Sequence, residues 1–199
     1  MTALLLDSSS SNLTVALSVQ GEIIYEVEYE AWQRQSELLT WEINQLFQKT
    51  KLTAQDLTAI VVSVGPGSYT GVRIAVSVAK TFSYALKIPL YKTSSLQAMR
   101  VPNKITIAVL DARGGRSYVG VYKDDATLLA DTILTNEETL NLVNKYENAV
   151  FSGELTHLKR ESEPFNRALN LLHAIQETNK VNDVKKLKPV YLKEQYGQK

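Results

Sequence analysis

The sequence predicts an α/β protein of two lobes, each formed by one copy of a duplicated motif with a mixed sheet and flanking helices. Three strands followed by a helix, a strand and a helix are predicted twice along the chain. An aspartate, Asp7 or Asp111, ends the first strand of each copy, and the composition of 44% apolar and 22% charged residues is that of a folded globular protein. Pro102 interrupts the pattern, so we expect lobes at residues 1–102 and 103–199, with the final ~10 residues returning to the first lobe.

The first copy changes from strand to helix periodicity. Apolar and polar residues alternate in its third strand, and Gln20–Gly21 marks a tight hairpin turn before that strand. Apolar residues then recur at helical spacing, and a β-branched run typical of a buried parallel strand follows. The predicted elements are strands at 3–6, 13–19 and 22–29, a helix at 35–49, a strand at 60–64 and a helix at 72–86.

The second copy repeats this order in a shorter and more divergent form. Thr135 and Glu138 have the spacing of a capping box, which predicts that a helix begins there and continues to about residue 146. The other predicted elements are strands at 105–110, 117–122, 127–134 and 149–151, and a helix at 165–175.

Charge and cysteine content exclude several classes of function. The 22 Lys and Arg nearly balance the 21 Asp and Glu, so the chain has no long-range field of its own for capturing nucleic acid. The absence of cysteine excludes disulfides, thiolate zinc sites and a cysteine nucleophile. His157 and His173 lack the spacing and acidic neighbours of a metal site, and they support no Ser/His/Asp set. Because there is no signal peptide or long apolar run, we expect a cytoplasmic protein that does not contact membranes.

Three loops are candidates for binding an anion. The turn at 7–12 has a carboxylate and four serines, but it lacks the glycine that lets backbone amides approach a phosphate. The turn at 111–116 has two glycines and two arginines. The loop at 65–73 has three glycines and a predicted helix start at Thr70, without a Walker A sequence. Each loop also has a purely structural interpretation as a connecting turn or a place of close packing. The candidate anion or nucleotide contacts are Asp7, Ser9, Ser10, Gly67, Ser68, Thr70, Asp111 and Arg113.

Six short motifs follow one another along the chain. They are LLDSS at 5–9, QSELL at 35–39, GPGSYTGVRI at 65–74, TSSL at 93–96, DAR at 111–113 and PVYL at 189–192. Together they resemble the TsaB/YeaZ family, which takes part in the threonylcarbamoyl modification of the tRNA adenosine beside the anticodon. The resemblance is close over residues 1–122 and loose beyond them. Gln35 stands where the family commonly has histidine, which removes any polar role specific to that histidine.

The resemblance implies an actin-like, ribonuclease-H-like (ASKHA) fold and a scaffold with no catalytic residues, metal ligands or intrinsic cofactor. Such a subunit binds and activates a TsaD-type transferase together with a TsaE-type ATPase, and it meets tRNA only through that complex. ATP or ADP has room at the subunit junction, and the docking face can pair with a second copy when the partner is absent. On this interpretation the helices at 35–49 and 72–86 form the pairing surface. Its predicted residues are Leu38, Leu39, Trp41, Ile43, Leu46, Val72, Arg73, Val76 and Lys80.

The alternative function is an actin-like ATPase or small-molecule kinase with an irregular phosphate loop. This hypothesis predicts saturable binding of magnesium-ATP and loss of turnover on Asp7→Asn, whereas the scaffold hypothesis predicts negligible turnover by the chain alone. A third hypothesis, a stand-alone RNA-binding protein, is disfavoured by the charge balance.

Overall fold

The computed structural model describes residues 1–31 and 33–192. The first part of the chain forms β1 (Thr2–Asp7), β2 (Asn12–Val19), β3 (Glu22–Glu30), α1 (Gln35–Thr50), β4 (Ala59–Ser63), α2 (Tyr69–Leu86) and β5 (Leu90–Thr93), with 3-10 turns η1 (Ala54–Asp56) and η2 (Gln97–Met99). The six elements predicted here are confirmed, each within three residues at either end. The strand β5 was not predicted, because four residues are too few to show a period.

The second part forms β6 (Ile105–Asp111), β7 (Arg116–Lys123), β8 (Ala126–Thr135), α3 (Asn136–Lys145), β9 (Val150–Gly153) and α4 (Arg167–His173), with 3-10 turns η3 (Thr156–Leu158), η4 (Glu177–Asn179) and η5 (Val184–Lys186). The predicted capping box is confirmed, since the Thr135 hydroxyl accepts the Glu138 N–H at 3.1 Å and the Glu138 carboxylate accepts the Thr135 N–H at 2.8 Å.

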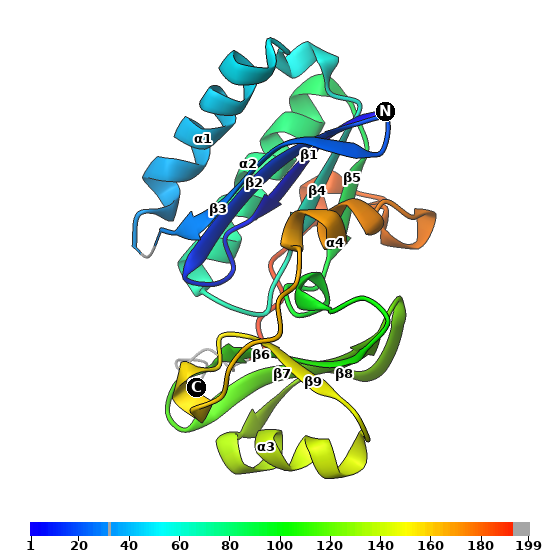
Figure 1. Ribbon diagram of the computed structural model, residues 1–199. Helices are drawn as coiled ribbons and strands as arrows, with labels where there is room; N and C mark the ends of the chain where they lie inside the picture. The colour runs from blue at the N-terminus through cyan, green and yellow to red at the C-terminus, as the bar shows by residue number, and fades with distance from the viewer. Residues whose placement is uncertain (32, 193–199) are drawn as a thin grey trace.

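The two sheets, seen one below the other in Figure 1, share the order of four strands, and the first sheet adds β5 at its edge. Their strand orders are β3-β2-β1-β4-β5 and β8-β7-β6-β9. In each sheet the first strand of the copy pairs antiparallel with the second and parallel with the fourth. This shared order confirms the predicted duplication.

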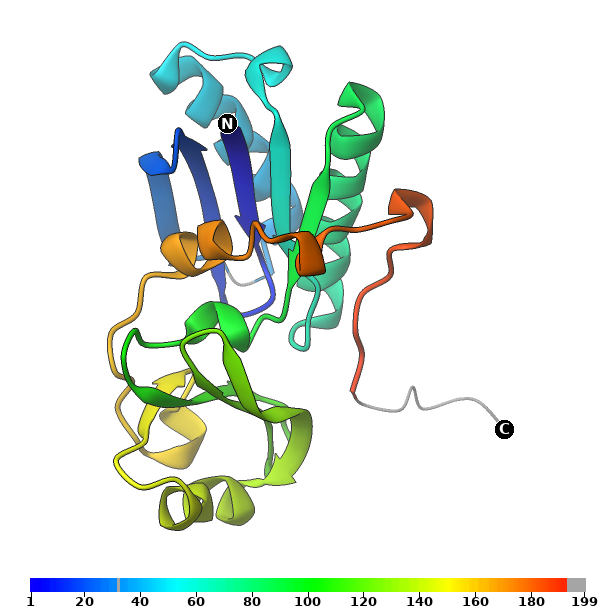
Figure 2. The ribbon, with the colours of Figure 1, turned by 90° about the vertical axis from the view of Figure 1, so that its right-hand side faces the viewer.

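The first sheet is covered on both faces. Alternate residues of β1 point to opposite faces of the sheet. Leu4 and Leu6 pack under α1 and α2, whereas Ala3 and Leu5 pack under α4 (Figure 2). The strands β1 and β4 are almost wholly buried, as parallel strands between two layers of helix should be.

The position of α4 corrects the predicted lobe boundary. We expected residues 103–199 to form the second lobe, but Ala168 and Leu171 are buried against the first sheet. The chain then stays on the first lobe, where Leu187 joins the core under α2 and the Val190 N–H donates to the Val64 carbonyl at 2.7 Å. The return therefore begins about twenty residues earlier than predicted. Of the last ten residues, 193–199 lie outside the described part of the chain.

Within the described residues, no helix combines the length and apolar character needed to cross a bilayer.

Candidate functional site

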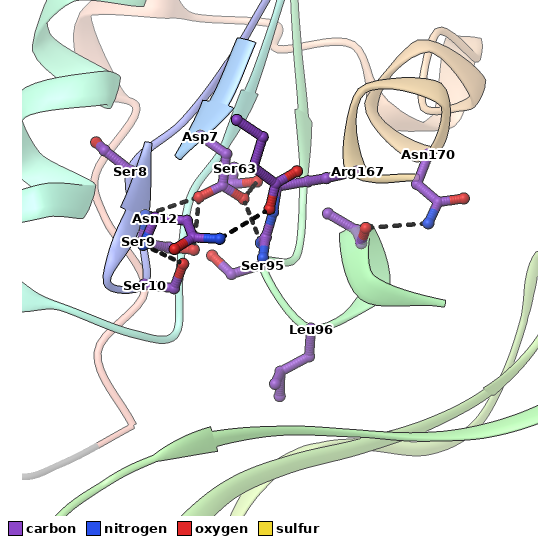
Figure 3. Close-up of polar contacts among 12 residues, drawn as sticks. Asp7, Ser8, Ser9, Ser10, Asn12, Ser63, Ser95, Leu96, Arg167 and Asn170 are labelled. Atoms are coloured by element: carbon purple, nitrogen blue, oxygen red, sulfur yellow. Dashed lines mark hydrogen bonds and ion pairs between the residues drawn. The ribbon is translucent and has the colours of Figure 1, made fainter. Parts of the chain in front are cut away.

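The carboxylate of Asp7 lies at the end of β1 and is buried, with 1% of its surface exposed. Oδ1 accepts the Ser9 N–H and the Ser9 hydroxyl, both at 2.7 Å. Oδ2 accepts the Ser63 hydroxyl at 2.6 Å and Nη1 of Arg167 at 3.3 Å (Figure 3). A carboxylate has about four acceptor positions, so these donors occupy them all.

Arg167, at the start of α4, supplies the counter-charge from a position 160 residues away in the sequence. Its side chain is 4% exposed, and its Nε also donates to Glu28 Oε1 at 3.3 Å. Burial by itself lowers the pKa of the guanidinium, but the carboxylates of Asp7 and Glu28 more than offset burial and leave that pKa raised. The pair is a buried, hydrogen-bonded ion pair that joins α4 to β1.

The serine hairpin after Asp7 is packed against the glycine-rich loop that precedes α2. The Ser68 N–H donates to the Ser9 carbonyl at 2.6 Å. A Cβ on Gly67 would lie 2.1 Å from that carbonyl oxygen, and one on Gly71 would lie 1.8 Å from the Ser8 carbonyl oxygen. These glycines therefore allow close packing of backbone on backbone, which is the structural interpretation of the loop.

The start of α2 differs from the prediction. Ser68 is the N-cap, and its hydroxyl accepts the Gly71 N–H at 3.3 Å, so Thr70 lies inside the first turn. Ser68, four residues before Val72, the first residue of the apolar stripe, is therefore a better N-cap signal than Thr70, which lies nearer to Val72.

A cavity of about 640 Å³ opens between the two lobes and brings together all the predicted anion contacts except Asp7. Ser9, Ser10, Gly67, Ser68 and Thr70 line it from the first lobe, and Asp111 and Arg113 line it from the second. Three carboxylates, those of Glu30, Asp111 and Glu154, also border it. The Ser11 N–H donates to Glu154 Oε1 at 2.7 Å, which ties the two lobes together at this cavity.

The two matching aspartates have different environments. Asp111 is exposed, and its Oδ1 accepts the Arg113 N–H at 2.7 Å in a local turn. Asp7 is buried and outside the cavity lining. The duplicated positions therefore do not form a symmetric pair of reactive carboxylates.

The predicted pairing surface is corrected in part, because five of its nine residues face the protein's own core. Leu39, Ile43, Leu46, Val72 and Val76 are at most 4% exposed and pack beneath the two helices. The apolar stripe of a helix covers its own sheet first. Leu38 and Lys80 are half-buried, and Trp41 and Arg73 are exposed.

Two polar residues of α1 have contacts that the sequence did not reveal. Gln35 is buried, and its Nε2 donates to the Ser10 carbonyl at 3.3 Å, so it supports the serine hairpin. Glu42 is buried and accepts the Tyr29 hydroxyl at 2.6 Å, which anchors α1 to β3. Burial, followed by the bond to Glu42, raises the pKa of Tyr29.

The fold also brings one serine and one histidine together in the second lobe. The distance between Ser117 Oγ and His157 Nε2 is 2.8 Å, and the Ser117 hydroxyl donates to Asn136 Oδ1 at 3.0 Å. Ser117 is fully buried, so its hydroxyl is closed to a substrate. This arrangement is a structural contact and not an activated nucleophile.

Comparisons with known proteins agree with the fold. A family model described as "TsaD: tRNA N6-adenosine threonylcarbamoyltransferase" matches residues 27–195. The tRNA threonylcarbamoyladenosine biosynthesis protein TsaB of Bacillus subtilis is 34% identical over 67% of this chain and 60% of its own length. The protein of the same name from Buchnera aphidicola (subspecies Schizaphis graminum) is 29% identical over 73% of this chain and 70% of its own.

Two solved structures show the same fold over 96% of this chain and 99% of theirs. YeaZ from Pseudomonas aeruginosa superposes with a TM-score of 0.78 at 24% identity. A second structure, described as an uncharacterized protein with similarity to peptidase YeaZ from the same organism, has a TM-score of 0.81 at 23% identity. This chain therefore belongs to the TsaB/YeaZ family, within the wider group that the TsaD model matches.

Proposed function

We propose that this chain is a non-catalytic scaffold subunit that binds and activates a TsaD-type transferase, together with a TsaE-type ATPase, for N6-threonylcarbamoylation of the tRNA adenosine next to the anticodon. The names of the TsaB relatives and of the family model support the process. Because the substrate of this modification is a tRNA, we propose that the chain acts in the cytoplasm.

The state of Asp7 is the observation that carries the non-catalytic part of the proposal. A carboxylate that holds a metal-bound or water-bound phosphate needs acceptor positions open toward the ligand. Those of Asp7 are taken by Ser9, Ser63 and Arg167, and the residue does not line the cavity between the lobes. The fold thus keeps the strand and turn, while the carboxylate serves as an internal structural charge.

The exposed side of α1 and α2 supports the docking part of the proposal. Trp41 on α1 is 53% exposed and Tyr84 on α2 is 62% exposed, and both are residue types that anchor protein interfaces. Leu38 on α1 and Ile74 and Val78 on α2 are half-buried, which adds partly exposed apolar surface to both helices. A partner related to this chain would present equivalent helices, and two such flanks can meet about a pseudo-two-fold axis. The same geometry permits pairing with a second copy.

A chain that hydrolyses ATP alone is the second candidate, and the cavity between the lobes is the observation that favours it. The charges at the cavity weigh against it, because three carboxylates and Arg113 leave an excess of negative charge facing a polyphosphate. We therefore propose that ATP or ADP binds only when the partner completes the site. Calorimetric titration of the chain alone with magnesium-ATP tests this point, and saturable binding with turnover would support the second candidate.

The docking surface is tested by mixing the chain with a TsaD-type subunit and measuring complex formation by analytical ultracentrifugation. Trp41→Glu should weaken the complex by about tenfold or more, since it places a charge at the centre of an apolar interface. Leu128→Glu is the matched control, because Leu128 is exposed on β8 in the second lobe. Equal affinities of Trp41→Glu and the wild type would contradict the proposed surface.

A further inference from the structure

Arg100 is a buried cation at the junction of the two lobes, directly after η2. Its side chain is 7% exposed, and Nη2 lies 3.3 Å from Oδ1 of Asp125, whose own side chain is 67% exposed. Among residues 1–31 and 33–192, the guanidinium has no other hydrogen-bond or ion-pair partner. The guanidinium carries five N–H groups, and this one contact leaves most of them without a partner among those residues.

Arg167, the other buried arginine described above, has more counter-charge around it than Arg100 has. Arg167 has two carboxylate partners, which raise its pKa despite burial. Burial lowers the pKa of Arg100, and Asp125 and Asp124 offset only part of this effect. Arg100 is thus a desolvated positive charge without a full counter-charge, an arrangement that costs free energy unless an anion completes it.

A polar cavity of about 240 Å³ lies against Arg100. Its walls come from three parts of the chain: Thr93 and Gln97 beside β5 and η2, Thr127 in the second lobe, and His173, Thr178 and Asn179 at and after α4. The segment after α4 runs beside β5 (Figure 2), and Lys180 forms an isolated antiparallel β-bridge with Tyr91. All six side chains carry a hydrogen-bond donor group, of which the Thr93 hydroxyl donates to Gln97 Oε1 at 3.3 Å and the Asn179 amide donates to the Ala174 carbonyl at 3.1 Å. Asp125 is the one carboxylate of this lining.

We infer that this cavity, which we call the Arg100 pocket, binds a small oxyanion of the phosphate class. A guanidinium fork with further donors on several walls suits a tetrahedral anion whose oxygens point in all directions. The volume is below that of sites that enclose drug-sized ligands, so the pocket accommodates a phosphate group and not an entire nucleotide. The free ion and the terminal group of a phosphate monoester present the same chemistry.

Asp125 acts in this arrangement as the competitor of the anion. It is exposed, and within the described part of the chain its side chain is held by the contact with Arg100 alone, so it can turn toward solvent when an anion takes its place. Because the walls belong to both lobes and to the segment after α4, a bound anion would also hold these parts together. Phosphate should therefore raise the melting temperature of the protein.

Isothermal titration of the full chain with sodium phosphate, at constant ionic strength set with sodium chloride, tests the inference. The wild type should bind one phosphate, and Arg100→Gln should weaken binding by about tenfold or more, because charge-assisted hydrogen bonds are lost. Asp125→Asn should tighten binding by about fivefold, because the competing charge is removed. Glu137→Gln makes the same change of charge at an exposed site on α3 and should leave the affinity unchanged.

Two further titrations distinguish a phosphate monoester from the free ion as the ligand, and the Arg100 pocket from the cavity that Arg113 lines. Adenosine monophosphate binding that is lost in Arg100→Gln would identify a phosphate monoester as the ligand, and binding of inorganic phosphate alone would identify the free ion; either result supports the pocket. Absence of binding by both, or binding lost in Arg113→Gln and kept in Arg100→Gln, would overturn it. If Arg100→Gln does not fold, Asp125→Asn decides alone, since unchanged or weaker binding in that variant contradicts the inference.

Discussion

Replacing Arg167 by methionine tests whether Asp7 is a structural charge. Methionine keeps an unbranched apolar stem beside Phe165, but it removes the bonds to Asp7 and Glu28. The Asp7 carboxylate is then left buried with three neutral donors, from Ser9 and Ser63.

Removing one member of a buried ion pair costs ~3–5 kcal/mol. The three remaining hydrogen bonds place Arg167→Met at the lower end, about 3 kcal/mol of the free energy of unfolding. For a chain of 199 residues this corresponds to a fall in melting temperature of about 6–12 °C. Asp7→Asn leaves Arg167 paired with Glu28, so we expect a smaller loss of about 2 kcal/mol.

Urea unfolding followed by circular dichroism measures these free energies and their coupling. The double variant Asp7→Asn/Arg167→Met should lose at least ~1 kcal/mol less than the sum of the single variants, because the two side chains are in contact. A carboxylate kept for catalysis at the expense of stability would behave differently, since Asp7→Asn would then stabilise the protein. That result, or strict additivity of the two substitutions, would refute the structural assignment of Asp7.

Three further substitutions test the packing described above. Gly71→Ala should destabilise the protein by about 2 kcal/mol, because its Cβ would meet the Ser8 carbonyl oxygen at 1.8 Å; a gain in thermal stability, as helix propensity alone favours, would contradict this packing. Glu42→Gln should bring the pKa of Tyr29 down toward its ordinary value in an ultraviolet titration and cost about 1 kcal/mol, whereas an unchanged tyrosinate titration would mean that the contact is absent in solution. Asp131, on β8, is half-buried and its Oδ2 accepts the Ser94 hydroxyl at 2.5 Å. Burial raises the pKa of Asp131, so the folded state retains its proton to higher pH than the unfolded state does. Wild-type stability relative to Asp131→Asn should therefore fall as the pH rises from the unfolded pKa through the folded one, and parallel stability profiles would be the contrary result.

The periodicity of the sequence was enough to predict the duplicated fold, because each repeat has alternating strands and a helix with one apolar face. The same periodicity could not identify the surface that each helix covers. The apolar positions Leu39 and Ile43 were assigned to a partner, whereas their own sheet buries them. The helix α4 was recognised, but an apolar face does not say which of two sheets it will join.

The sequence was enough to identify the loops that form the site, but it did not show which side chains contact one another there. The glycine and serine loops identified in the sequence do meet at one cavity. The pairing of Asp7 with Arg167 joins residues 160 positions apart, and no local signal encodes it. Arg100 carried no signal either, because an arginine between two lobes reads as an exposed charge until its burial is known.

The rate of threonylcarbamoyl transfer to tRNA by a complex reconstituted with the Asp7→Asn chain tests the proposed division of labour most directly. The TsaD-type subunit and the TsaE-type ATPase are held constant, and the variant is added to saturation so that complex formation is complete. We expect a rate within about twofold of that obtained with the wild-type chain, because Asp7 touches no reacting atom in this account. A transfer rate reduced by about a hundredfold or more, with the complex intact, would show that this chain contributes a reactive group.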